Sequence, residues 1–116
     1  MQAFKIKGGI KLSGDITPQG AKNEALQIIC ATLLTSEEVI INNITDIIDI
    51  NKLITLLKSL GVEVNKIKTN SYYFKAENID LNYLNSEKFK TEGKSLRGSI
   101  MIVGPLLARF GKAYIP

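Results

Sequence analysis

The chain has 116 residues, a formal net charge of +4 and a hydrophobic content of 45%. This length supports at most one domain, and the hydrophobic content is ordinary for a folded core. The chain has no histidine, which excludes histidine acid–base or metal chemistry, and its single cysteine excludes an internal disulfide. The basic balance favours acidic ligands, but the lysines are scattered and form no block typical of a nucleic-acid tail.

The first residues give no sign of a secretory leader, because charges interrupt their apolar positions. The longest apolar run, residues 100–108, is too short to span a bilayer. A lone cysteine also fits a reducing compartment. We therefore expect a cytoplasmic protein.

The first half of the chain alternates strand and helix patterns. Apolar residues alternate with lysines around a Gly-Gly pair, which predicts a β-hairpin over residues 4–12. A wide apolar face predicts a largely buried helix over residues 21–34, and a β-branched strand follows at 38–41. A second helix is expected over residues 46–60, with Gly61 as its C-terminal cap.

The second half begins with strands, expected from Val62 onward and over residues 71–75. Residues 78–90 are polar and predict irregular structure with at most one helical turn. Residues 95–110 predict a third helix that is apolar almost all round, in which Pro105 introduces a kink or starts a new turn.

The pattern before the first helix returns before the third. Gly20-Ala21-Lys22 and Gly93-Lys94-Ser95 each lead into an apolar helix that ends in Leu-Leu, about seventy residues apart. This predicts repeated units of a sheet packed on helices. The third helix needs covering on every side, yet only a short strand over residues 113–115 is expected after it. We therefore expect a piece of a larger protein.

Lys22 and Asn23 stand at the start of the first predicted helix. The amides of a first helical turn have no internal partners and the helix dipole is positive there, so carboxylates usually stabilise this end. Gly20, which lets the backbone approach closely, together with free amides and an ammonium group, indicates a site for phosphate or carboxylate. The alternative is a solvated lysine on a surface helix.

Arg97 repeats this arrangement at the start of the third helix. A guanidinium suits phosphate because its planar fork donates two parallel hydrogen bonds. Gly98 would leave room for close approach and Ser99 would add a hydroxyl donor. The alternative is a structural ion pair of Arg97 with Glu92 or Glu24. Two cations at helix starts in a repeated unit favour a shared anionic ligand.

The other reactive or aromatic residues have ordinary structural explanations. Cys30 lies in an apolar helix and is expected to be a small buried filler. The aromatic run 72–74 fits core and edge packing better than base stacking. The helix dipole explains Arg109 at the end of the third helix, and Asp46 and Asp49 are most simply the cap and first-turn acids of the second.

Several longer motifs carry a family resemblance. They are Lys7-Gly8-Gly9, Gly20-Ala21-Lys22-Asn23, Asn43-Ile44-Thr45-Asp46-Ile47, Leu57-Lys58-Ser59-Leu60-Gly61-Val62, Leu96-Arg97-Gly98-Ser99-Ile100 and the run from Gly104 to Gly111. Together they cover essentially the whole chain, which resembles the N-terminal part of the UDP-N-acetylglucosamine enolpyruvyl transferases. The sister family, the 5-enolpyruvylshikimate-3-phosphate synthases, typically has Gly-Ser-Lys-Ser at the first of the specific motifs, so Ala21 and Asn23 argue against it.

The resemblance implies an α/β (α+β) fold, part of an inside-out α/β barrel built from repeated sheet-on-helix units. Residues 1–19 would be an N-terminal hairpin that pairs with the other domain in the full enzyme. Residues 20–116 would be an incomplete first enolpyruvyl transferase domain, made of one repeat and the start of the next.

The resemblance also implies a reaction. The enolpyruvyl group of phosphoenolpyruvate would pass to the 3-hydroxyl of UDP-N-acetylglucosamine, releasing phosphate, at the first committed step of peptidoglycan synthesis and without a metal or organic cofactor. Lys22 and Asn23 would contact phosphoenolpyruvate, with Lys22 catalytic, and Arg97 would help to bind UDP-N-acetylglucosamine. The expected partners are these substrates and the remainder of the same polypeptide, with no nucleic acid and no membrane.

The family's mobile Pro-Gly-Gly-Cys loop, whose cysteine is a general acid and the target of fosfomycin, has no match here. Cys30 does not correspond to it, so we expect residues 1–116 alone to be inactive. Two alternatives stay open. One is a transferase of the shikimate type, and the other is a non-catalytic nucleic-acid-binding α/β module, suggested by the pI of about 9.2 and the aromatic run.

Overall fold

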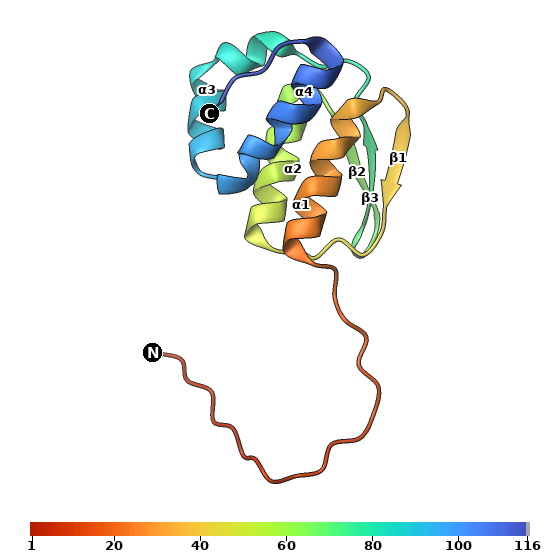
Figure 1. Ribbon diagram of the computed structural model, residues 1–116, viewed down its shortest axis with the longest axis vertical. Coiled ribbons are helices and arrows are strands. Elements are labelled where there is room, and N and C mark those ends of the chain that lie inside the picture. The colour runs from red at the N-terminus through yellow and green to blue at the C-terminus, as the bar shows by residue number, and fades with distance from the viewer. Residues whose placement is uncertain (116) are drawn as a thin grey trace.

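The computed structural model describes residues 1–115. A three-stranded antiparallel sheet lies on one side of the molecule, and the helices pack against one of its faces (Figure 1). This combination of helices and a small sheet confirms the expected α+β class.

The sheet has the order β1-β3-β2, so the central strand is the last in sequence. Phe74 of the central strand lies opposite Val39 on one side and Val64 on the other, which places an apolar row across the sheet. A turn at Asn70, with a φ of 60°, joins the last two strands. The strands are β1 (Glu38–Ile41), β2 (Glu63–Lys68) and β3 (Ser71–Lys75).

Residues 22–110 also contain four α-helices and three 3-10 segments. They are α1 (Lys22–Ala31), η1 (Thr32–Leu34), α2 (Ile48–Leu60), η2 (Leu81–Asn85), α3 (Glu87–Lys94), η3 (Arg97–Ile102) and α4 (Val103–Phe110). Gly61 ends α2 with a φ of 108°, which confirms the predicted glycine cap. A side chain there would also overlap the carbonyl oxygen of Asn78.

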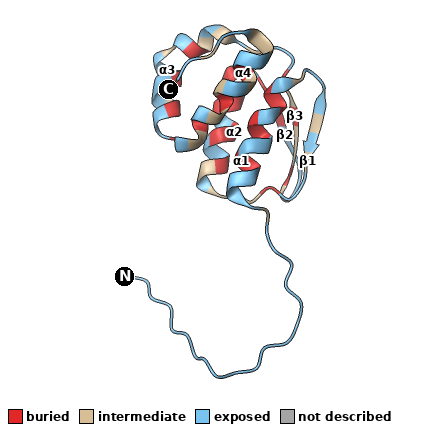
Figure 2. Cartoon of the chain, viewed as in Figure 1, coloured by how far each residue is buried: buried red, intermediate tan, exposed pale blue. Residues whose placement is uncertain are grey.

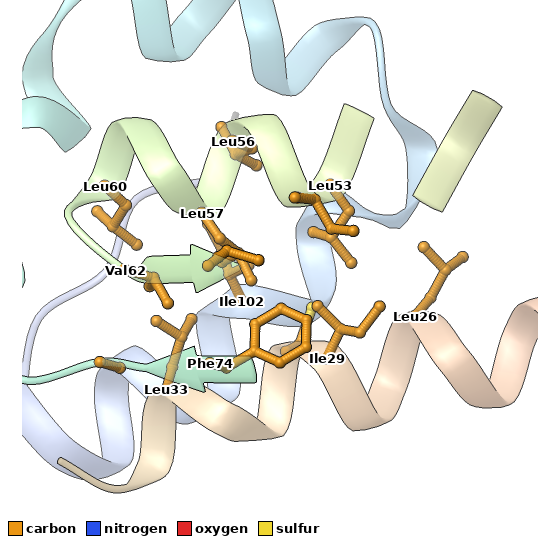
Figure 3. Close-up of a cluster of buried hydrophobic side chains, with 14 of the residues drawn as sticks. Leu26, Ile29, Leu33, Leu53, Leu56, Leu57, Leu60, Val62, Phe74 and Ile102 are labelled. Atoms are coloured by element: carbon orange, nitrogen blue, oxygen red, sulfur yellow. The ribbon is translucent and has the colours of Figure 1, made fainter. Parts of the chain in front are cut away.

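The core lies between the sheet and the first two helices (Figure 3). Ile29 and Leu33 from the first helical segment meet Leu53 and Leu57 of α2 over the ring of Phe74, and all five side chains are fully buried. Burying a side chain of this size contributes about 1.5–3 kcal/mol. This packing holds α1 and α2 side by side.

The side chain of Arg109, in the last turn of α4, bonds to the backbone at the ends of η1 and β3. Its Nη1 donates hydrogen bonds to the carbonyl oxygens of Leu33, Thr35 and Ala76, at 3.0, 3.1 and 2.6 Å. The sequence predicted only an interaction with the helix dipole. The structure instead makes this side chain a link between α4, the end of η1 and the end of β3.

Residues 1–19 form no strand, and every one of them is exposed (Figure 2). The predicted hairpin over residues 4–12 is therefore absent from this structure. Its apolar side chains, such as Phe4 and Leu12, lie against nothing, and an isolated two-stranded hairpin is only marginally stable in water. The radius of gyration of 17.4 Å, against roughly 13 Å for a compact chain of this length, reflects this extended segment. Pairing with another domain stays a prediction.

The polar stretch 78–90 is more helical than predicted. Asp80 accepts a hydrogen bond from the Asn82 amide and starts η2, and Ser86 accepts one from the Phe89 amide and starts α3. These caps, together with the burial of Phe89, support helices whose composition gave little apolar signal.

The predicted third helix is two segments, because η3 gives way to α4 at Val103. Pro105 lies in the first turn of α4, where its missing N–H costs no hydrogen bond, so the alternative in which it starts a new turn is confirmed. One face of these segments is buried, at Ile102 and Leu106, whereas Ile100 and Leu107 are about half exposed. Residues 113–115 form no strand, contrary to expectation.

Candidate functional site

The starts of α1, α2 and η3 meet at one end of the molecule, the lower end for α1 and α2 in Figure 1. The Nζ atom of Lys22, the first residue of α1, lies 2.5 Å from Oδ2 of Asp49 in the first turn of α2. One turn further along α2, the Nζ atom of Lys52 donates to the carbonyl oxygen of Ser95 at 3.3 Å, two residues before Arg97. Residues distant in sequence therefore form one polar cluster.

None of these three helix starts has a side-chain cap. The N-cap positions are occupied by Ala21, Ile47 and Leu96, whose apolar side chains accept no hydrogen bond. Backbone N–H groups in the first turns are consequently available to water or a ligand, and the helix dipoles favour an anion there. The anion site at the start of α1 stays a prediction.

The predicted capping role of Asp46 is wrong. Its Oδ1 accepts a hydrogen bond from Nδ2 of Asn51 at 2.9 Å, and Ile47 takes the N-cap position of α2. Asp49 does lie in the first turn of α2 as predicted, but it points to Lys22 of the neighbouring helix. The hydrogen bond from Lys22 lowers the pKa of the Asp49 carboxyl below its usual value.

Lys22 is neither fully solvated nor free. Its side chain is 49% exposed, and that of Asp49 is 40% exposed, so the pair faces solvent at the edge of a shallow hollow. Asn23 is exposed on the same turn of α1. The hollow is lined by Lys22, Ile47, Ile48 and Asp49.

Gly20 serves packing in this structure, which differs from its predicted role in admitting a ligand. A Cβ atom at this position would overlap the carbonyl oxygen of Asn43. The carbonyl oxygen of Gly20 accepts a hydrogen bond from the hydroxyl of Thr45. The glycine therefore lets the chain before α1 cross the loop after β1, and this crossing places Lys22.

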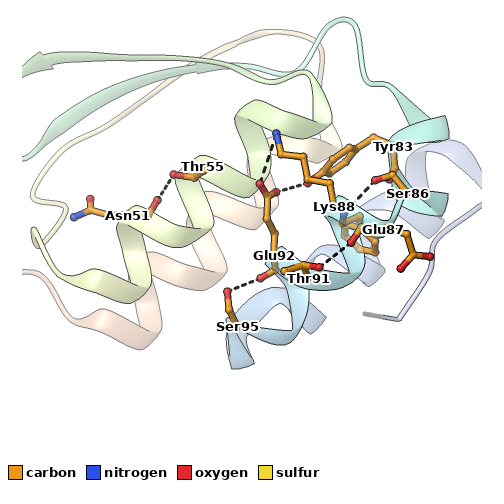
Figure 4. A network of polar contacts seen from close by, with 10 residues as sticks. Asn51, Thr55, Tyr83, Ser86, Glu87, Lys88, Thr91, Glu92 and Ser95 are labelled. Atoms are coloured by element: carbon orange, nitrogen blue, oxygen red, sulfur yellow. Dashed lines mark hydrogen bonds and ion pairs between the residues drawn. The ribbon is translucent and has the colours of Figure 1, made fainter.

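Arg97 is exposed at the first position of η3. Within residues 1–115 no carboxylate lies at ion-pair distance from it, so neither of the two suggested ion pairs is seen. Glu92 instead accepts a hydrogen bond from the Tyr83 hydroxyl and lies 3.7 Å from Nζ of Lys88 (Figure 4). Burial, followed by the bond to Glu92, raises the pKa of Tyr83 to about 12.

The two residues after Arg97, Gly98 and Ser99, make packing and hydrogen-bond contacts within the fold. A Cβ atom on Gly98 would lie 3.2 Å from Cδ1 of Leu26, so this glycine lets η3 pack closely on α1. Ser99 is buried, and its hydroxyl donates to the carbonyl oxygen of Gly93 at 3.0 Å. The predicted ligand roles of both residues are therefore wrong in this structure.

Cys30 and Phe74 behave as their structural explanations predict. Cys30 is buried, and desolvation raises the pKa of its thiol to about 12. Phe74 is in the core, with Tyr72 packed against it. Across residues 1–115, no group of three or more histidine, cysteine, aspartate or glutamate side chains could hold a metal ion. In the same range no helix is both long and apolar enough to cross a membrane.

Lys52 is a member of the cluster that sequence reasoning missed. It lies one helical turn after Asp49, so the two share a face of α2, and its charge also acts on the Asp49 carboxyl. Two carboxylates lie in these first turns, Glu24 in α1 and Asp49 in α2. The cluster presents the cations Lys22 and Lys52 beside uncapped helix starts, with Arg97 exposed two residues after Ser95. Such an arrangement suits a small anionic group.

Comparison with known proteins gives a consistent result. Residues 6–115 match the family described as EPSP synthase (3-phosphoshikimate 1-carboxyvinyltransferase). The UDP-N-acetylglucosamine 1-carboxyvinyltransferase of Bacteroides thetaiotaomicron is 62% identical over 115 residues, covering 99% of this chain. The enzymes of the same name from Porphyromonas gingivalis and Idiomarina loihiensis are 51% and 41% identical over 116 residues, covering 100% and 99% of it. The chain spans about a quarter of the length of these relatives, 26%, 27% and 26% respectively.

Proposed function

Because the chain belongs to the EPSP synthase family of carboxyvinyltransferases, we propose that it forms part of a UDP-N-acetylglucosamine 1-carboxyvinyltransferase. The reaction transfers the enolpyruvyl group of phosphoenolpyruvate to the 3-hydroxyl of UDP-N-acetylglucosamine and releases phosphate. The observation that carries this proposal is Lys22, an accessible cation at an uncapped helix start in a chain 62% identical to an enzyme of that name.

Each predicted site residue has a role in the proposal. Lys22 neutralises the charges of phosphoenolpyruvate and holds its carbon in position for attack by the sugar hydroxyl. Asn23, exposed beside it, donates from its side-chain amide to the same substrate. Arg97 is exposed and makes no ion pair within the described residues, which leaves its guanidinium for the sugar nucleotide.

The proposal extends to partners and location. The remaining part of the site comes from other segments of the same polypeptide, and neither nucleic acid nor a membrane takes part. The protein acts in the cytoplasm, supported by a buried free thiol that suits a reducing compartment, at the first committed step of peptidoglycan synthesis.

A second candidate is transfer to shikimate 3-phosphate, because the description of the matched family names that substrate. Ala21 and Asn23 weigh against it, since the sister enzymes typically have serine at both positions. The two candidates differ only in the acceptor, so a single assay separates them.

The test measures phosphate release from phosphoenolpyruvate by the full-length polypeptide that carries this chain, with UDP-N-acetylglucosamine or shikimate 3-phosphate as acceptor. We expect release with UDP-N-acetylglucosamine alone, and a loss of about 10²–10³-fold in kcat in Lys22→Ala. Lys58→Ala is the matched control, because it removes another exposed lysine, in the last turn of α2 and away from the cluster. Release with neither acceptor would refute the proposal, and residues 1–116 alone are expected to show no turnover.

A further inference from the structure

Asp49 is a side chain of the cluster to which the function proposed above gives no role. We infer that Asp49 is a positioning residue, which holds the ammonium group of Lys22 in place for the phosphoenolpyruvate anion. The inference rests on the proposed function. It starts from the distance of 2.5 Å between Asp49 Oδ2 and Lys22 Nζ, the contact that joins the first turns of α2 and α1.

Fold stability does not account for this pair. Both side chains are about half exposed, and ion pairs of that kind contribute little to folding because water screens them and ordering two side chains costs entropy. The core beneath already holds α1 against α2. The pair therefore has its main effect on the lysine itself.

The ammonium group of a lysine needs such a partner if it is to be held in one position. It sits on a flexible four-carbon stem, whereas the carboxylate of Asp49 comes from a short side chain on a well-packed helix. An ammonium group has three N–H donors, so the bond to Asp49 leaves two for an anionic ligand. Orientation before the ligand arrives is what raises the affinity of a prepared site.

The negative charge of Asp49 does not cancel this gain. Lys52 lies close enough to act on the same carboxyl, and its Nζ is held by the carbonyl oxygen of Ser95. Two lysines therefore share the Asp49 carboxylate, and the uncapped starts of α1 and α2 add the positive ends of two helix dipoles. The opposite arrangement, in which Asp49 only competes with the ligand for Lys22, predicts that removing Asp49 strengthens binding.

The experiment uses the full-length polypeptide and compares Asp49→Asn with Asp46→Asn. Both variants remove a carboxylate near the start of α2, but Asp46 bonds to the amide of Asn51 and not to a lysine. For Asp49→Asn we expect the KM for phosphoenolpyruvate to rise about tenfold while kcat changes less than about threefold. Asp46→Asn is expected to match the wild type. An unchanged KM in Asp49→Asn, or a lower KM at low salt, overturns the inference.

A double-mutant cycle separates positioning from a general structural role. In a Lys22→Ala background, Asp49→Asn is expected to cause no further loss of kcat/KM, because the lysine that it positions is gone. An additive loss overturns the inference. If Asp49→Asn does not fold, Asp49→Glu tests the inference instead. This variant moves the carboxylate by one methylene and should raise the KM for phosphoenolpyruvate about threefold. An unchanged KM refutes positioning. A wild type without phosphate release refutes the proposed function itself, and an active wild type with an indifferent Asp49 refutes only this inference.

Discussion

Replacing Gly20 with alanine tests how closely the chain before α1 crosses the loop after β1. The new Cβ atom would overlap the carbonyl oxygen of Asn43 and lie 3.2 Å from its carbonyl carbon. The loop cannot easily move, because the amide of Ile44 donates to the carbonyl oxygen of Asn70 at 2.8 Å. About 1.5 Å of displacement is needed to restore ordinary contact, and it falls on the segment that leads into Lys22.

The magnitude follows from this geometry. Overpacking of this kind costs about 1–3 kcal/mol of unfolding free energy, and a shift of 1 Å at a reacting group costs about 10²-fold in rate. Urea unfolding and phosphate release measure the two effects. The matched control is Gly104→Ala, where a Cβ atom meets nothing within 4 Å. A Gly20→Ala variant with the stability and kcat/KM of the control would show that the crossing does not set the position of Lys22.

Two further predictions concern residues away from the cluster. Arg109→Leu should lower the unfolding free energy by about 3 kcal/mol, because one charged nitrogen can donate two N–H bonds at about 1.5 kcal/mol each. Arg109→Lys should lower it less. Equal urea midpoints for the two variants would contradict the role of these hydrogen bonds in stability. The Cys30 thiol should not react with disulfide reagents at pH 8 until the chain is unfolded. Because its pKa rises from 9.0 to about 12 on folding, the stability it contributes is complete below pH 9 and is lost as the pH rises toward 12, which thiolate absorbance against pH would show.

Much of the fold follows from local patterns. The strands at 38–41 and 71–75 match the prediction residue for residue, because β-branched and aromatic runs are local signals. Gly61 is equally local, since a helix end that needs a positive φ selects glycine. The helix over residues 87–94 was missed because its stability comes from a Ser86 cap and one buried phenylalanine within a polar stretch.

In the candidate site, too, local features could be predicted from the sequence and contacts between elements could not. The sequence predicts that Lys22 and Arg97 stand at helix starts, because helix starts have local signals. The pairing of Lys22 with Asp49 depends on how α1 packs against α2, and no local pattern encodes it. Ser99 was assigned to a ligand for the same reason, since its acceptor is a backbone carbonyl in the preceding helix.

The link made by Arg109 also orders events during synthesis on the ribosome. Its three carbonyl partners lie 76, 74 and 33 residues earlier in the chain. The sheet and the first two helices are complete once residue 75 has emerged, and they can pair while the rest is still being made. The carbonyl oxygens at the end of η1 and the end of β3 can accept from Arg109 only after that residue has been translated, 33 residues after Ala76, so this link closes after the sheet and the first two helices can form.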